Sequence, residues 1–269
     1  MKISVASAVH GQTGTTTVAL FASHALALTQ KKNICLTHAD FGSTVLFSAV
    51  GIEAEADMTR SLSHVTMMLK NNMLQPGELP DYAINLFTGL DMYSTHKLTL
   101  DIDDLLSFYG FLLNKLSIYD HTIVDVDAGF TSEISRLALS VSDIILIPVN
   151  HNYSVLEESK KFKVNLENML ANERKRRNTR ILYVLNHYNP SISSYKRVAG
   201  ILNVKATDIL TLHYSPYFVK TFNQGKISDY LRDALLGKGR VLSLRNDMKG
   251  LCKTLLGKEF LWEMKKGAR

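Results

Sequence analysis

Five short apolar runs, separated by longer stretches with helical spacing, constrain the fold of this chain most strongly. Each run is rich in Ile, Val and Leu without polar alternation, which is typical of a strand covered on both faces. The runs are KISVASAV, NICLTHA, HTIVDVD, DIILIPV and RILYVLN. Helical spacing recurs over 16–30, 101–116, 131–142 and 154–171. Strands alternating with helices predict an α/β fold with a mainly parallel, twisted sheet flanked by helices.

Length and composition indicate one globular domain with a substantial core. The chain has 269 residues, of which 46% are hydrophobic and 21% charged, as in soluble proteins with a buried interior. The longest apolar stretch, VALFASHALAL, falls well short of the ~20 residues that a membrane span requires, and the N-terminus does not have the form of a signal peptide. We therefore expect a single domain over residues 1–269, located in the cytoplasm.

The cysteines and histidines do not suggest a metal centre. Cys35 and Cys252 match no metal-binding spacing, and Cys35 lies in an apolar run. We expect reduced, buried thiols rather than a disulfide or an iron–sulfur ligand pair. The nine histidines show no paired spacing at a common strand end, which favours oxygen ligands over histidines for any metal that the protein binds.

Positive charge is concentrated toward the C-terminus. Residues 221–269 carry 11 basic and 5 acidic side chains, which accounts for the whole net charge of +6. A second basic cluster comprises Arg174, Lys175, Arg176, Arg177 and Arg180. Such surfaces attract nucleic acid or anionic lipid, although a basic helix end also suits the helix dipole. Both interpretations remain open.

The turn after the first run has the form of a phosphate-binding loop. In a parallel sheet, ligands bind beyond the carboxyl ends of the strands, and the first run ends in HGQTGTTT. Gly11 and Gly14 permit tight backbone geometry, and a helix beginning near Thr15 would direct free N–H groups at an anion. The motif G-x-x-x-x-G-K-[ST] fails twice, because Val9 replaces its first glycine and Thr15 its lysine. A plain strand-to-helix turn is the alternative.

Carboxylates lie at the ends of the second and third runs. Asp40 could orient a water or hold the metal shell, and Asp125 could accept from a metal-bound water. Carboxylates beside a phosphate site make sense chiefly when Mg²⁺ bridges the like charges, with the Thr16 hydroxyl as a direct ligand. Taken singly, each aspartate could instead cap a helix or a turn.

Six ordered segments resemble the ParA/MinD family of deviant Walker ATPases over roughly residues 1–230. HGQTGTTT aligns with the family's K-G-G-x-G-K-T-T, and HADFGS aligns with its D-x-D-P-Q-G segment. YDHTIVDVDAG is similar to the YDYIIIDTPPG segment, and SDIILIPVNHNYSVL to the run that follows it. LYVLNHY and SPYFVKTFNQGKISDYL resemble the late segments near the base.

The resemblance implies a P-loop NTPase that binds ATP with Mg²⁺ and forms a homodimer. It implies catalytic roles for Asp40 and Asp125, and metal binding by Thr16 directly and by both aspartates through water. It implies nucleotide contacts from the loop and from the base side. These residues are His10, Gly11, Gln12, Thr13, Gly14, Thr15, Thr16, Thr17, Asn186, Tyr217 and Phe218.

Both lysines of the family's loop are absent here. Thr15 stands where a lysine contacts the β- and γ-phosphates, and His10 stands where a lysine reaches the partner's nucleotide. His38 stands at the position of the first aspartate in the family's D-x-D-P-Q-G segment. Because stabilisation in phosphoryl transfer is largely electrostatic, the losses should impair hydrolysis more than binding. The sequence therefore predicts an ATP-binding, dimeric positioning or partition protein, possible DNA binding, and weak or no hydrolysis.

Two other functions fit the same residues. One is a nucleotide-independent scaffold that localises a pilus, secretion or conjugation machine, near the TadZ-like branch of the family. The other is a MinD-like membrane association through the tail LCKTLLGKEFLWEMKKGAR, which carries Phe260, Trp262 and several lysines. For that tail, a last helix packed on the domain is the favoured interpretation, because Gly257 interrupts the pattern.

Overall fold

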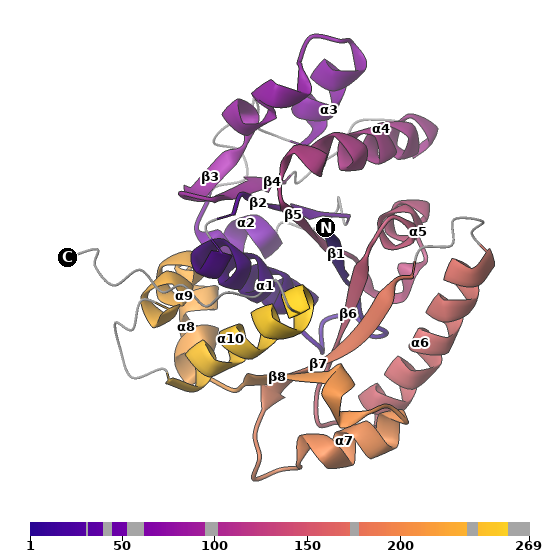
Figure 1. The fold of residues 1–269 in the computed structure, drawn as a ribbon, viewed down its shortest axis with the longest axis vertical. Helices are drawn as coiled ribbons and strands as arrows, with labels where there is room; N and C mark the ends of the chain where they lie inside the picture. The colour runs from indigo at the N-terminus through magenta and orange to yellow at the C-terminus, as the bar shows by residue number, and fades with distance from the viewer. Residues whose placement is uncertain are drawn as a thin grey trace.

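A twisted eight-stranded sheet forms the centre of the described chain, in the order β3-β4-β2-β5-β1-β6-β7-β8 (Figure 1). The structure is a computed structural model that describes residues 1–30, 32–39, 45–52, 62–94, 102–172, 178–235 and 242–257. All neighbouring strands are parallel except β3 and β4, which form an antiparallel pair. The strands are β1 Lys2–Val5, β2 Ile34–His38, β3 Ile84–Phe87, β4 Leu90–Tyr93, β5 His121–Asp125, β6 Ile144–Val149, β7 Arg180–Tyr188 and β8 Ile209–His213.

The predicted α/β class is confirmed, and the five predicted strands occupy the centre of the sheet. β1 lies between β5 and β6, with Val5 level with Asp125 on one side and Leu146 on the other. The sequence analysis did not include β3, β4 and β8, which lie toward the two edges. β3 and β8 are only partly buried, so they lack the uninterrupted apolar pattern of the central strands.

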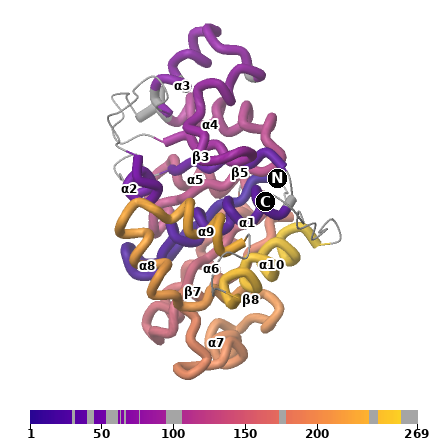
Figure 2. Tube along the Cα trace, turned by 90° about the vertical axis from the view of Figure 1, so that its left-hand side faces the viewer, coloured from indigo at the N-terminus to yellow at the C-terminus, as the bar shows by residue number. Residues whose placement is uncertain are grey.

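One face of the sheet is covered by five helices that share a core with it. Figure 2 views the molecule from the side on which α8, α9 and α10 lie over α1. The helices of this face are α1 Thr15–Gln30, α2 Val45–Val50, α8 Pro216–Asn223, α9 Ile227–Leu235 and α10 Leu242–Leu256. A helix that is apolar on most sides can be stable only between two layers, and α1 contacts the sheet, α9 and α10.

The opposite face is covered by a second set of helices with its own core. These are α3 Leu62–Lys70, α4 Ile102–Lys115, α5 Glu133–Ser140, α6 Tyr153–Asn172 and α7 Tyr195–Leu202. Short 3₁₀ turns connect the elements at Pro76–Tyr82, Leu116–Ile118, Ala128–Phe130 and Ala206–Asp208. The predicted helix over 131–142 is shorter than expected, because the Ser132 hydroxyl accepts from the Ser135 amide and caps the helix there.

His24 joins α1 to α9 inside the first core. Its ring is fully buried; Nδ1 donates to the Leu20 carbonyl at 2.7 Å, and the Ser228 hydroxyl donates to Nε2 at 2.9 Å. Burial lowers the pKa of His24 to about 4, because the charged ring would be cut off from water. The imidazole is therefore neutral at physiological pH.

Cys35 and Cys252 are both buried and free, as expected. Burial raises the pKa of each thiol, which makes them unreactive. No helix in the described part of the chain is long and apolar enough to span a bilayer. Several residues singled out in the sequence lie outside the described residues: Asp40, the basic cluster 174–177 and the tail 258–269.

Candidate functional site

The predicted phosphate loop joins the end of β1 to the start of α1. The helix begins at Thr15, so the amides of its first turn face the loop. Gly11 and Gly14 have φ values of 69° and 78°, in the left-handed region that glycine adopts without strain. The turn therefore needs both glycines, and the strand–loop–helix arrangement matches the prediction from HGQTGTTT.

Thr16 and Asp125 meet beside this loop. The Thr16 hydroxyl donates to Oδ2 of Asp125 at 2.6 Å, linking the first turn of α1 to the end of β5. Both residues line a cavity of about 50 Å³, together with Thr15, His38 and Asp127. Hydroxyl and carboxylate oxygens are the donors that Mg²⁺ prefers. The residues present therefore fit a magnesium ion, with Thr16 as a ligand and Asp125 acting through water.

His38, at the end of β2, lines the same cavity. It lies level with Asp125 across the β2–β5 pair and is 2% exposed. Its Nε2 forms a 3.1 Å hydrogen bond with the Ser94 hydroxyl, and its carbonyl accepts from the Tyr109 hydroxyl at 3.0 Å. The ring that stands at the first aspartate position of the family's D-x-D-P-Q-G segment is thus held beside the cavity by its hydrogen bond with Ser94.

His10 contacts its own chain across the mouth of the loop. Its Nδ1 lies 3.2 Å from Oδ1 of Asp127, and its side chain is 73% exposed. Asp127 also accepts from the amide of Ala128, and the Gly129 amide donates to the Ser7 carbonyl at 2.8 Å. The segment after β5 is therefore hydrogen-bonded directly to the start of the phosphate loop.

Two asparagine amides hold the loop from the other side. Nδ2 of Asn186 donates to the Thr13 carbonyl at 2.9 Å, and Nδ2 of Asn150 donates to the Gln12 carbonyl at 3.1 Å. Asn186 is 1% exposed and lies against the loop, whereas the family resemblance implies a nucleotide contact for it. The sequence analysis did not name Asn150 as a site residue, although its position at the end of the fourth run was a usable signal.

The residues predicted for the base side lie near a small crevice at the ends of β7 and β8. Its volume is about 10 Å³. It is lined by Thr17, Asn186, His187, Leu212, His213, Ser215, Phe218 and Val219. Phe218 is buried, whereas Tyr217 is 68% exposed and is not among these lining residues. The structure therefore brings Thr17, Asn186 and Phe218 together and leaves Tyr217 at the surface.

His213 is a residue of this crevice that sequence analysis missed. Its Nδ1 lies 2.8 Å from Oδ1 of Asp247 on α10, and its amide donates to Oδ2 at 2.8 Å. Burial raises the pKa of the Asp247 carboxyl, and the His213 contacts oppose that rise. His187, beside it, has a pKa lowered by burial. Detecting His213 from sequence would have required finding β8.

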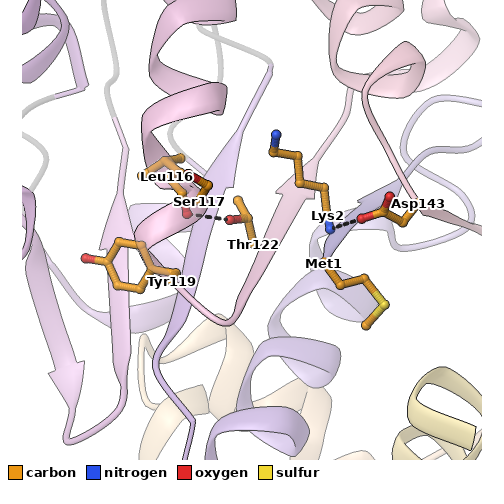
Figure 3. Close-up of a pocket in the computed structure, with 7 residues that line it drawn as sticks. All are labelled: Met1, Lys2, Leu116, Ser117, Tyr119, Thr122 and Asp143. Atoms are coloured by element: carbon orange, nitrogen blue, oxygen red, sulfur yellow. Dashed lines mark hydrogen bonds between the residues drawn. The ribbon is translucent and has the colours of Figure 1, made fainter. Parts of the chain in front are cut away.

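A larger cavity lies at the opposite end of the strands, near the beginning of β1 and β5 (Figure 3). Its volume is about 160 Å³. The Lys2 amide donates to Asp143 across this region at 2.8 Å. Ligands of parallel sheets bind beyond the carboxyl ends of strands, so the loop side is the better candidate site. Within the described residues, no three His, Cys, Asp or Glu side chains converge as a metal site.

Comparison with known proteins places this geometry on a known fold. No known family profile matches the chain, and no curated protein matches it. The MinD cell division protein of Aquifex aeolicus superposes with a TM-score of 0.67 at 20% identity, covering 98% of this chain and 100% of that chain. The septum site-determining protein MinD of Pyrococcus horikoshii, complexed with Mg-ADP, gives 0.69 at 16% identity, over 97% and 99%.

A third structure extends the comparison to another protein with the same fold. A single-residue variant of Cyanothece McdA, in complex with ATP, superposes with a TM-score of 0.68 at 20% identity, covering 97% of this chain and 98% of that chain. The chain therefore has the α/β fold of P-loop NTPases. More narrowly, its fold is that of the MinD and ParA ATPases, as the resemblance implied.

Proposed function

We propose that this protein is an ATP-binding, dimer-forming positioning protein of the ParA/MinD type, with weak or no ATP hydrolysis. One observation carries the proposal. The Thr16 hydroxyl, in the first turn of α1, meets the Asp125 carboxylate beside the loop, which supports a site for a magnesium-bound nucleotide in a loop that has neither lysine. Two of the superposed structures hold Mg-ADP and ATP, which supports a nucleotide as the ligand.

The phosphates would lie over the loop and the first turn of α1. Backbone amides there would donate to phosphate oxygens, and the helix dipole would favour the negative charge. Mg²⁺ would be held by Thr16 and, through water, by Asp125; when bound it would neutralise charge on the phosphates. We assign Asp40 to the same shell from the sequence resemblance alone. Phe218 and the crevice around it are the proposed base side.

Slow hydrolysis follows from the missing positive charge. The described residues that line the cavity beside Thr16 include neither lysine nor arginine. His10 is directed to Asp127 of its own chain, which offsets any charge that it carries. Charge that develops on a transferring phosphoryl group would then be stabilised mainly by amides and Mg²⁺, and removal of such a cation costs several orders of magnitude in related chemistry.

A basic face on α10 supports DNA as a candidate partner. Arg245, Lys249 and Lys253 are spaced four residues apart on this helix, and the two lysines are exposed. Residues at that spacing share one face of a helix. A partition-type function would use such a face to grip DNA by its phosphates, with binding that falls steeply as salt is raised.

The scaffold function is favoured by the same loss of both lysines, and one experiment separates the two. Calorimetry with ATP and ADP, with and without Mg²⁺, is combined with light scattering on the same samples. Micromolar, Mg²⁺-dependent ATP binding that shifts the protein toward dimers supports the proposal. Absence of binding at millimolar nucleotide would refute it and leave the nucleotide-independent scaffold.

A further inference from the structure

We propose that the side-chain amides of Asn150 and Asn186 form a clamp that fixes the shape of the phosphate loop. They have this positioning role in a loop that lacks both family lysines. The inference rests on the proposed nucleotide function and adds residues to its site. The clamp holds the loop by its carbonyl groups, so that the backbone N–H groups form the anion cradle. The two residues come from neighbouring strands, β6 and β7, which run side by side in Figure 1.

The sheet register brings the two asparagines level with each other. Val149, the last residue of β6, is paired with Leu185 on β7. Asn150 directly follows the end of β6, and Asn186 is the next residue within β7. Both side chains therefore lie at the carboxyl ends of the strands, close to the end of β1 that leads into the loop. Two amides at this spacing can reach two successive carbonyls of one turn.

Hydrogen bonds fix the orientation of each amide group. Oδ1 of Asn150 accepts from the Asn152 amide at 2.9 Å, and Oδ1 of Asn186 accepts from the His187 amide at 2.9 Å. Because an N–H donor must meet an oxygen, these bonds determine which end of each side chain is Nδ2. Both Nδ2 groups then face the loop, where they donate to the carbonyls of Gln12 and Thr13.

The two anchored carbonyls determine the direction of the next two amides. In a planar trans peptide the C=O and N–H bonds point in opposite directions. Anchoring the carbonyls of Gln12 and Thr13 toward the asparagines therefore turns the N–H groups of Thr13 and Gly14 away from them. Within the described part of the chain, neither of these amides donates to another residue. Two adjacent donors are thus oriented for an anion before it binds.

Gly14 leaves the space that the Asn186 amide occupies in this clamp. It has a φ of 78°, and a Cβ atom at this position would lie 2.5 Å from Nδ2 of Asn186. Any larger residue would displace the amide or the loop. The absence of a side chain at Gly14 therefore serves the Asn186 contact as well as the turn itself.

Preorganisation matters more in this loop than in one with a lysine. A lysine attracts phosphate at a distance and tolerates small displacements of its flexible stem. Backbone amides bind only when they already point at the ligand, and ordering them at the moment of binding costs affinity. With Thr15 at the lysine position, the clamp supplies order where charge is missing.

The test uses the full-length protein and two probes, Mg-ATP and Mg-tripolyphosphate, which has no base. Asn150→Asp and Asn186→Asp keep the Oδ1 acceptor but remove the donor to the loop. Asn152→Asp is the matched control: it adds the same charge two residues from Asn150 and keeps the oxygen that accepts from Ser154. Amide ¹⁵N NMR relaxation over residues 10–15 of the nucleotide-free protein is measured in parallel, because order parameters report how rigidly an amide without a hydrogen-bond partner is held.

We expect Asn150→Asp to weaken both probes by the same factor, roughly five- to tenfold, and to lower the backbone order parameters of Thr13 and Gly14. Asn152→Asp should change neither. Unchanged tripolyphosphate binding and unchanged order parameters in Asn150→Asp would overturn the clamp, even if Asn186→Asp does not fold. Loss of ATP but not tripolyphosphate in Asn186→Asp would show that Asn186 contacts the base and would overturn its clamp role.

The relaxation measurement separates this inference from the proposed function. If the parent protein binds neither probe, the nucleotide function is refuted. Lower order parameters at Thr13 and Gly14 in Asn150→Asp would then still support the clamp as a device that orders the loop. Unchanged order parameters in that case would refute both.

Discussion

The Thr16 hydroxyl donates a 2.6 Å hydrogen bond to Asp125, joining the first turn of α1 to the end of β5. This contact brings together two residues that are 109 positions apart in the chain, and it places a hydroxyl and a carboxylate side by side at the site that we propose for a phosphate-bound cation. A bound Mg²⁺ would be held by the oxygen of the Thr16 hydroxyl and, through a water molecule, by Asp125.

Replacing Thr16 by valine should remove the Mg²⁺ dependence of nucleotide binding while leaving the fold intact. Valine keeps the shape of the side chain but has no oxygen for the metal. We expect ATP affinity in the presence of Mg²⁺ to fall by about tenfold or more, because a direct metal ligand is lost. Calorimetry at several Mg²⁺ concentrations measures this. Thr131→Val, at an exposed position on the 3₁₀ turn after β5, is the control, and an equal loss there would contradict the assignment.

Restoring a lysine at Thr15 should strengthen nucleotide binding and raise hydrolysis. Thr15 lines the cavity beside Thr16 and Asp125, so the ammonium group would reach the phosphates. We expect at least a tenfold gain in ATP affinity over Thr15→Gln, which has an uncharged side chain of similar reach. The gain should shrink as salt is raised. If both variants behave alike, electrostatic loss at this position is not what limits the site.

Acid should destabilise the protein through His24. The pKa of His24 is lowered to about 4 in the folded chain, against about 6.5 when unfolded. Between these values the unfolded chain binds more protons, so stability is present above pH 6.5 and is lost as pH falls toward 4. His24 should contribute a loss of about 2 kcal/mol in the free energy of unfolding between pH 7.5 and 5.

Denaturant unfolding of the parent and of His24→Gln at both pH values checks this. The glutamine variant should lose less stability on acidification than the parent does. Val18→Ala, also in the buried part of α1, should lower stability at both pH values without changing their difference. A parent-like pH dependence in His24→Gln would assign the acid sensitivity to other groups, such as His121, whose pKa is also lowered by burial.

An alanine at Gly51 should destabilise the fold through a backbone clash. Gly51 follows α2 and lies against Gly225, in the turn between α8 and α9; both have positive φ. A Cβ atom at Gly51 would overlap the Gly225 carbonyl, so we expect a loss of about 2 kcal/mol or more. Gly200→Ala, in open space on α7, should instead be neutral or stabilising by up to about 1 kcal/mol. Thermal unfolding of the two variants distinguishes these outcomes.

The central strands and the loop could be predicted from sequence because their signals are local. A strand buried on both faces, such as Ile144–Val149, reads as an unbroken apolar run, and the glycines at 11 and 14 identify the turn by themselves. β8 was not predicted because its residues are only partly buried, so they do not form an unbroken apolar run. The contact between Asn150 and Gln12 spans 138 residues, and only the register of β6 with its neighbours determines it.

The base side shows a second limit of sequence reasoning. The sequence places Tyr217 and Phe218 together near the base, yet the structure buries one and exposes the other. Adjacent residues of a helix point in different directions, and both lie in the first turn of α8. Which of the two faces the crevice depends on how that helix packs, which no local pattern reveals.

The packing of α10 on α1 has a consequence for how the protein is made. The helix α1 that follows the loop is synthesised more than 200 residues before α10, which packs on part of its apolar surface. Until residues 242–256 are synthesised, the loop is attached to a helix with that apolar surface uncovered. The environment of α1, and of the loop attached to it, is therefore complete only after α10 has been added to the chain.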